Sequence, residues 1–157
     1  MNIDKQQTET YIITGLSDLD PVTVYVTNYK LGQGKMVIEC FGDVWGCYWG
    51  AMGENTLQGF VLSASNDYLL GKLLRETEQT DFEAINDLAH KRGYPDIEVT
   101  SDIEIALCAD DMAQCFGDDW MMDLPRCHTS DYHYLGRILN AVKSAFSNEL
   151  VKQPSRS

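Results

Sequence analysis

Residues 35–49, KMVIECFGDVWGCYW, contain two runs rich in β-branched and aromatic side chains, separated by the dipeptide Gly42-Asp43. This arrangement is typical of a β-hairpin with a two-residue loop. With Gly42 and Asp43 as the loop, Phe41 pairs with Val44, and one face presents an apolar set to a core: Met36, Ile38, Cys40, Trp45, Cys47 and Trp49. The opposite face is also too apolar to be fully solvated, which predicts that another surface covers it: Val37, Glu39, Phe41, Val44, Gly46 and Tyr48.

Two further strands are predicted before this hairpin. Residues 11–14 form a short β-rich run, and residues 22–27 alternate apolar and less apolar side chains with the period of a strand. Asp20-Pro21 separates the two runs, and Gly32 and Gly34 provide a turn before the hairpin. The N-terminal third therefore reads as an antiparallel sheet of three to four strands.

The pattern becomes helical after Gly53. Apolar side chains then recur three and four residues apart, and capping residues precede the runs. The predicted helices cover residues 56–64, 65–74 with Ser65 as cap, 80–92 with a Thr80–Glu83 capping box, about 102–116 with a Ser101–Glu104 capping box, and about 131–150. The segment 97–116 fits both a strand and a helix, and we expect a strand near 97–99 followed by the helix.

The predicted fold class is α+β, with the N-terminal antiparallel sheet followed by four to five helices packed on it. A chain of 157 residues is the usual size of one domain. We therefore expect a single domain over residues 1–150 and a flexible tail over 151–157. The polar N-terminus and the lack of a long apolar run indicate a cytoplasmic protein without membrane contact. The five cysteines fit reduced thiols better than disulfides.

The negative charge of the chain is concentrated in one region. Residues 76–123 contain fourteen Asp and Glu but only two basic residues, so this segment has the formal charge of the entire chain, −12. A field of one sign repels nucleic acid and attracts basic surfaces. We therefore expect no direct binding to nucleic acid, and we favour a partner with a basic surface.

Six short stretches, which fall into three pairs, resemble a known family: Ile13-Thr-Gly-Leu with Asp20-Pro-Val-Thr-Val-Tyr, Gly34-Lys-Met-Val-Ile-Glu-Cys with Trp49-Gly-Ala-Met-Gly, and Met112-Ala-Gln-Cys-Phe-Gly-Asp-Asp-Trp with Leu124-Pro-Arg-Cys. They are similar to small, uncharacterised acidic proteins encoded by tailed phages and prophages of enteric bacteria. The resemblance covers most of the chain and implies a phage accessory role in the cytoplasm of the host cell. It provides no catalytic or binding residues to transfer.

The leading hypothesis is an accessory protein that acts by binding and imitates DNA, with host defence proteins among the expected targets. Basic clefts that neutralise phosphates also attract well-placed carboxylates, so the acidic segment could block a nucleic-acid-binding site on a host protein. The expected partner-binding residues are Asp102, Glu104, Asp110, Asp111, Asp118, Asp119, Trp120 and Asp123. Two plainer interpretations compete with this one: the carboxylates are solvated helix faces, and Trp120 packs into the core.

Two hypotheses from other classes remain. Cys127, with His128 beside it and His133 beyond, could be the nucleophile of a hydrolase or transferase, although neighbouring side chains usually point apart. The Trp-rich sheet could instead make the protein a structural module that forms homo-oligomers. No cofactor is expected, and zinc is disfavoured because the chain lacks a C-x-x-C knuckle. Binding is favoured over catalysis.

Overall fold

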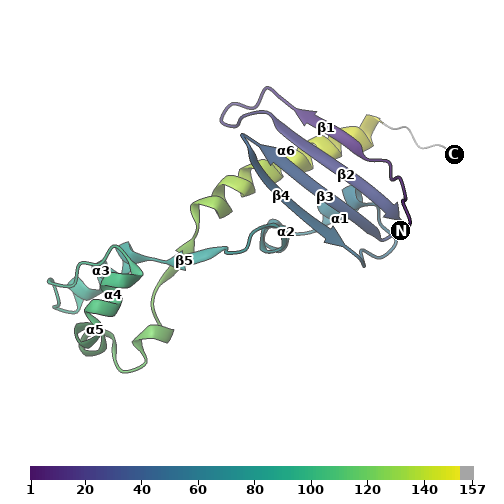
Figure 1. Cartoon of the computed structure of the whole chain (residues 1–157). Helices are drawn as coiled ribbons and strands as arrows, with labels where there is room; N and C mark the ends of the chain where they lie inside the picture. The colour runs from purple at the N-terminus through teal and green to yellow at the C-terminus, as the bar shows by residue number, and fades with distance from the viewer. Residues whose placement is uncertain (153–157) are drawn as a thin grey trace. The chain divides into compact units, whose positions relative to one another are not determined.

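The computed structural model of the chain describes residues 1–152. These residues form two compact units, each of which has its own core (Figure 1). The first, called the sheet unit, comprises residues 1–77 and the segment from Ser130 onward. The second, called the helical unit, comprises Glu78–Thr129 and is inserted between the two parts of the first.

The sheet unit contains a four-stranded antiparallel sheet. Its strands follow chain order: β1 (Glu9–Ile13), β2 (Val22–Lys30), β3 (Gln33–Cys40) and β4 (Asp43–Trp49). The buried valines of β2 alternate with less buried residues, and Val24 lies opposite Ile38 of β3. The period of two in the sequence thus gives the sheet its core face.

The β3–β4 hairpin has a different loop from the predicted one. Phe41 and Gly42 are the loop residues, with φ of 52° and 90°, and Cys40 lies opposite Asp43. Two consecutive positive φ values suit the primed turns that follow strand twist, and Gly42 fits the second position without strain. The pairing is therefore displaced by two residues from the predicted one. Because side chains alternate with period two, the predicted core face is nevertheless confirmed.

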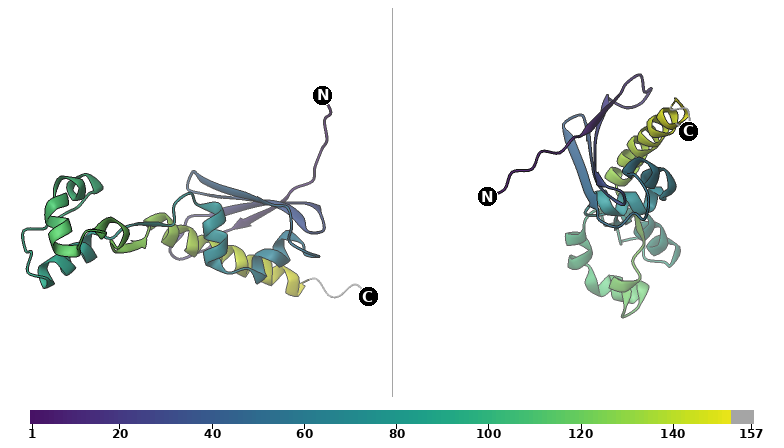
Figure 2. Two further views of the ribbon diagram at one scale, coloured as in Figure 1. Left: turned by 90° about the horizontal axis from the view of Figure 1, so that it is seen from below. Right: turned by 90° about the vertical axis from the view of Figure 1, so that its right-hand side faces the viewer.

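Three helices cover the core face of the sheet: α1 (Leu57–Ser63), α2 (Asn66–Leu73) and α6 (Ser130–Lys152) (Figure 2). The hydroxyls of Thr56 and Ser65 cap α1 and α2, as the sequence predicts for Ser65. The α6 stripe of Leu135, Leu139, Val142 and Phe146 is fully buried. The opposite face of the sheet carries exposed Ile12, Val44 and Tyr48, and no helix of the sheet unit covers it.

The helical unit is built from short elements. They are β5 (Glu78–Thr80), α3 (Phe82–Lys91), α4 (Asp102–Leu107), α5 (Ala109–Phe116), the 3₁₀ helix η1 (Trp120–Met122) and β6 (Arg126–His128). Strands β5 and β6 pair antiparallel, with Glu78 opposite His128, so the two ends of the unit lie side by side. The core contains Ile85, Ile97, Ile105, Met112 and Trp120.

Three local predictions for the helical unit are wrong. Residues 97–99 form no strand, because the side chain of Asn86 occupies the hydrogen-bonding groups of Val99 that a neighbouring strand would use. The helix expected over 102–116 is broken at Cys108, whose φ of −104° and ψ of 31° end α4 and begin α5. Asp81, not Thr80, caps α3 by accepting a hydrogen bond from the N–H of Ala84.

The α+β class with an N-terminal antiparallel sheet is confirmed. The single domain over residues 1–150 stays a prediction, because two compact units can still unfold in one cooperative transition. Of the tail predicted for 151–157, residues 151 and 152 belong to α6, and the remainder lies outside the described residues. Within residues 1–152, no helix has both the length and the apolar composition that crossing a bilayer requires.

Candidate protein-binding site

The helical unit contains an apolar cavity of about 560 Å³. Its walls come from β5, α4, α5, η1 and β6, that is, from segments up to 46 residues apart in the chain. Most of the lining is hydrocarbon or thioether: Ile105, Ala106, Ala109, Trp120, Met121, Met122 and Leu124. Thr80, Asp102 and Arg126 complete the wall with polar groups. A cavity of this size, apolar with a few polar groups, is typical of binding sites.

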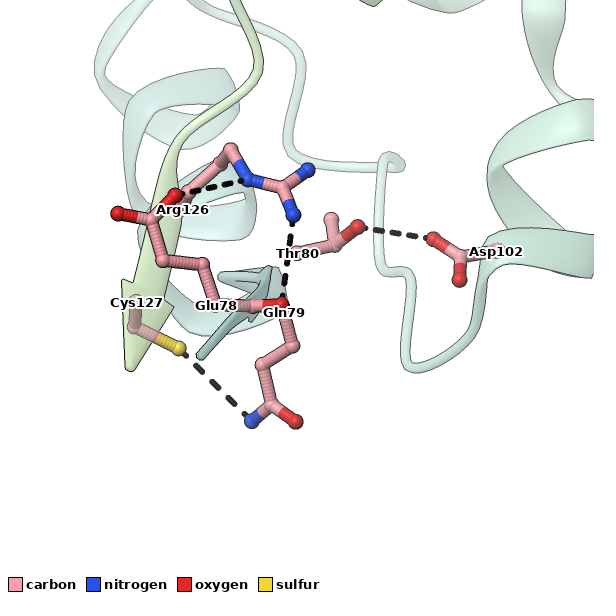
Figure 3. Close-up of polar contacts among 6 residues, drawn as sticks. All are labelled: Glu78, Gln79, Thr80, Asp102, Arg126 and Cys127. Carbon is pink, nitrogen blue, oxygen red and sulfur yellow. Dashed lines mark hydrogen bonds and ion pairs between the residues drawn. The ribbon is translucent and has the colours of Figure 1, made fainter. Parts of the chain in front are cut away.

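The polar groups of the cavity are held in place by the paired strands β5 and β6 (Figure 3). The hydroxyl of Thr80 donates to Oδ1 of Asp102 over 2.9 Å, which ties β5 to the start of α4. Arg126 forms an ion pair with Glu78, with 3.4 Å between Nε and Oε2, and also donates to the carbonyl oxygen of Glu78. Since Arg126 has its own counter-ion, Asp102 contributes uncompensated negative charge to the cavity.

Three consecutive apolar residues of η1 differ sharply in exposure. Trp120 is 6% exposed and packs in the core of the helical unit, while Met121 and Met122 are 72% and 87% exposed. All three line the cavity. The packing of Trp120 agrees with the plainer interpretation of this residue, whereas the two methionines present flexible apolar surface to the solvent.

All seven carboxylates of the expected partner-binding set are exposed: Asp102, Glu104, Asp110, Asp111, Asp118, Asp119 and Asp123. They spread over the region from the start of α4 to the end of η1, and only Asp102 and Trp120 of the expected set line the cavity. Within residues 1–152, the side chains of the last five accept no hydrogen bond and form no ion pair. Their negative charge is therefore open to solvent.

The acidic pairs recur every eight residues because they stand where helical segments begin. Asp102 and Glu104 are in the first turn of α4, Asp110 and Asp111 are in the first turn of α5, and Asp119 precedes η1. Carboxylates at these positions interact favourably with the positive end of the helix dipole. Part of the acidic pattern therefore has a structural cause, which is the stabilisation of helix N-termini. The prediction of one long helix over 102–116 hid this cause, because it placed Asp110 and Asp111 inside the helix.

Glu104 shows this structural role most directly. Its carboxylate accepts hydrogen bonds from the backbone N–H of Thr100 at 2.6 Å and from the Thr100 hydroxyl at 2.8 Å. These bonds, first of all the one from the backbone, lower the pKa of Glu104 below its ordinary value. The Ser101 hydroxyl accepts a hydrogen bond from the N–H of Glu104, as in the predicted capping box, while the carboxylate of Glu104 binds Thr100, the residue before the cap.

Few cations balance the acidic side chains in the helical unit. Glu78–Thr129 contains thirteen Asp and Glu against Lys91, Arg92 and Arg126, a formal charge of −10. Arg92 donates to the carbonyl oxygen of Cys115 at the end of α5 and stacks on Phe116, and Arg126 pairs with Glu78. The sheet unit, with eleven acidic and nine basic residues, has a formal charge of only −2.

The side chains of Cys127 and His128 do not point to the same side, as a catalytic pair would require. Both residues belong to β6, where successive side chains point to opposite faces. The Sγ atom of Cys127 accepts a long hydrogen bond from Nε2 of Gln79 on β5, 3.8 Å away (Figure 3). Among residues 1–152, no group of three or more His, Cys, Asp or Glu side chains is arranged to hold a metal ion.

Sequence reasoning missed most of the cavity. Thr80 and Arg126 come together only because β5 pairs with β6, and two strands of three residues give almost no periodic signal. Ala106 and Ala109 lie on either side of the helix break at Cys108. The one signal in the sequence is the run Trp120-Met-Met, three large apolar residues in a row within the acidic segment.

The chain is a small α+β protein whose helical unit is strongly acidic and contains an apolar cavity. The chain belongs to a phage family: the model described as "Phage family" (Phage_phiTE_072) matches residues 1–148. This match confirms the phage origin that the resemblance implies, while the enteric hosts stay a prediction. Comparison with curated proteins gave no match. Comparison with solved structures gave none either.

Proposed function

We propose that this phage protein is an accessory protein that acts by binding in the host cytoplasm, where its acidic helical unit blocks a basic nucleic-acid-binding site on a host protein. A host nuclease or another defence enzyme would be a partner of this type. The observation that supports the proposal is the formal charge of −10 in a unit of only 52 residues, compared with a formal charge of −2 in the sheet unit. Solubility alone does not require such an unequal distribution.

The exposure of the carboxylates supports the same proposal. Asp110, Asp111, Asp118 and Asp119 accept no hydrogen bond and form no ion pair within residues 1–152, so an incoming Lys or Arg meets no competing cation there. A protein that binds phosphates through several basic side chains gains most of its affinity from this electrostatic term. Several exposed carboxylates in one unit can compete for the same cations.

The test is affinity capture from host lysate at low and high salt. The bait is the tagged protein, in parallel with a variant in which Asp110, Asp111, Asp118 and Asp119 are all replaced by Asn. The matched control removes four charges from exposed positions of the sheet unit: Asp4→Asn, Asp18→Asn, Asp43→Asn and Glu54→Gln.

The proposal requires a nucleic-acid-binding protein that the wild type and the control capture, that the helical-unit variant does not, and that duplex DNA elutes competitively. Capture should also fall steeply as salt rises, because the contacts are between exposed charges. Equal capture by all three baits, or a partner that DNA does not displace, would exclude the proposed mode of action.

A second candidate function is a structural module that forms homo-oligomers through the sheet. The uncovered face, which carries exposed Ile12, Val44 and Tyr48, favours it, since exposed apolar patches on β-sheets commonly mark contacts. The formal charge of −2 on the sheet unit opposes self-association far less than the −10 of the helical unit. Light scattering after gel filtration tests this: Val44→Lys with Tyr48→Lys should give the monomer mass, and Met121→Lys should leave the mass unchanged.

A further inference from the structure

The cavity of the helical unit is open to a guest side chain. Ile105 and Trp120 form a buried apolar floor, and the small side chains of Ala106 and Ala109 leave space along α4 and α5. Met121 and Met122 line the same cavity and remain largely exposed. Contact of the methionine side chains with water is unfavourable, and these flexible thioether side chains adapt readily to apolar guests of different shape.

The charge around the cavity selects the chemistry of the guest. Asp102 lies in the wall with one carboxylate oxygen bound by Thr80, and the cation of the wall, Arg126, is paired with Glu78. The helical unit as a whole has a formal charge of −10. An anionic or nucleotide-like guest is therefore repelled, whereas a peptide segment with Lys or Arg beside an apolar side chain gains both attraction and burial.

We infer that this cavity takes an apolar side chain, of leucine or phenylalanine size, from a basic segment of the protein partner, and that Asp102 binds a cation next to it. The inference rests on the proposed function and adds a recognition element to it. The carboxylates attract basic proteins in general, and the cavity selects among them by the apolar residue they present. In this unit the exposed carboxylates provide the long-range attraction, and the residues that line the cavity provide the short-range burial.

The test uses two synthetic peptides of equal charge, each with six lysines around a central residue that is Phe in one and Ala in the other. Binding to the full chain is measured by calorimetry in 150 mM salt. The Phe peptide should bind at least tenfold more tightly than the Ala peptide. With ¹³C-methyl methionine labels, the Met121 and Met122 signals should shift with the Phe peptide and not with the Ala peptide.

Two matched variants on α4 separate the cavity from its surroundings. Ala106→Phe fills the cavity from an exposed helix position and should abolish the tenfold preference. Leu107→Phe adds an aromatic ring at the neighbouring exposed residue, which does not line the cavity, and should leave the preference intact. The methionine signals of the wild type give the same answer without any variant.

The outcomes distinguish this inference from the proposed function. Equal binding of both peptides, weakened by the four Asp→Asn changes, would overturn the cavity inference and leave the acidic-surface proposal standing. Binding of neither peptide, even at low salt, would overturn both. Tight binding of the Phe peptide with unchanged Met121 and Met122 signals would place the apolar contact elsewhere and also overturn the inference.

Discussion

Asn86 forms two hydrogen bonds with the backbone of Val99. The N–H of Val99 donates to Oδ1 of Asn86 at 2.9 Å, and Nδ2 of Asn86 donates to the carbonyl oxygen of Val99 at 3.0 Å. The side-chain amide thus takes the place of a neighbouring strand for one residue. Val99 is only 2% exposed, so water cannot easily replace either bond.

We expect Asn86→Ala to destabilise the helical unit by about 2–3 kcal/mol, because it leaves a buried N–H and a buried carbonyl without partners. The measurements are chemical denaturation and hydrogen exchange at the amide of Val99, which should lose its protection. Asn140→Ala is the control, since within residues 1–152 the exposed amide that it removes bonds only with Asn66 of the sheet unit. If the exchange rate at Val99 does not change, the two bonds do not hold this segment.

The same pair explains why the sequence misled the prediction for residues 97–99. Ile97 and Val99 are buried on one parity, which is the pattern of a strand, but the partner is a side chain. By contrast, burial alternates along β3 and the first part of β2, and strands were predicted at both places. Their bounds differ, since β2 continues to Lys30 and β3 already begins at Gln33, so that Gly34 belongs to a strand and not to the predicted turn. Sequence periodicity identifies elements that are long enough for the apolar pattern to repeat. It cannot show which group forms the hydrogen bonds of a short, isolated backbone segment.

Gly32 is held against a second loop of the sheet unit. Its N–H donates to the carbonyl oxygen of Asn55, its own carbonyl accepts from Met52, and its φ is +79°. A Cβ atom at this position would lie 2.3 Å from the carbonyl oxygen of Gly53. Neither the backbone at Gly32 nor the loop that contains Gly53 can move away without breaking these hydrogen bonds.

Gly32→Ala should therefore cost about 2–3 kcal/mol more than Gly15→Ala. Gly15 has a similar φ of +76° but no atom within 4 Å of the added Cβ, so its substitution isolates the cost of a left-handed residue, about 1 kcal/mol. Urea denaturation of the two variants and the wild type gives the comparison. Equal midpoints for the two variants would mean that the loop around Gly53 moves freely.

The cap of α4 predicts a pH-dependent contribution to stability. The pKa of Glu104 is lowered from its ordinary value of 4.5 by the hydrogen bonds from Thr100, so the folded state favours the carboxylate. The contribution is fully present above pH 4.5 and is lost as the pH falls through the lowered pKa. Glu104→Gln should therefore lower the denaturation midpoint at neutral pH, and its difference from the wild type should disappear in acid.

Glu83→Gln is the control for this experiment. Glu83 is an exposed residue in the first turn of α3, and within residues 1–152 it accepts no hydrogen bond from a side chain or a cap. It reports the general effect of removing one negative charge from the helical unit. If both variants show the same difference at every pH, the bonds to Thr100 do not account for the effect.

The candidate site could be predicted only in its electrostatic part. The count of acidic residues is visible in the sequence, and all seven predicted carboxylates are exposed. The cavity depends on contacts that no local pattern encodes: the pairing of Thr80 with Arg126 across β5 and β6, and the turn at Cys108 that brings Ala106 and Ala109 to one wall. Such contacts follow from tertiary packing.

The separation of the two cores leads to a last prediction. Every member of the sheet-unit core lies in residues 1–77 or after Ser130, and every member of the other core lies within Glu78–Thr129. Glu78 is opposite His128 in the β5–β6 pair, so the two ends of the helical unit are adjacent and a short linker can replace it.

We expect a chain in which a short Gly-Ser linker replaces residues 78–129 to keep the fold of the sheet unit. Near-UV circular dichroism from Trp45 and Trp49 and a cooperative denaturation curve are the measurements. Leu139→Asp in the shortened chain is the control, because it puts a charge into the fully buried stripe of α6 and should abolish the transition. An unfolded shortened chain would mean instead that the sheet unit needs the helical unit, and that residues 1–150 form the single domain predicted from the sequence.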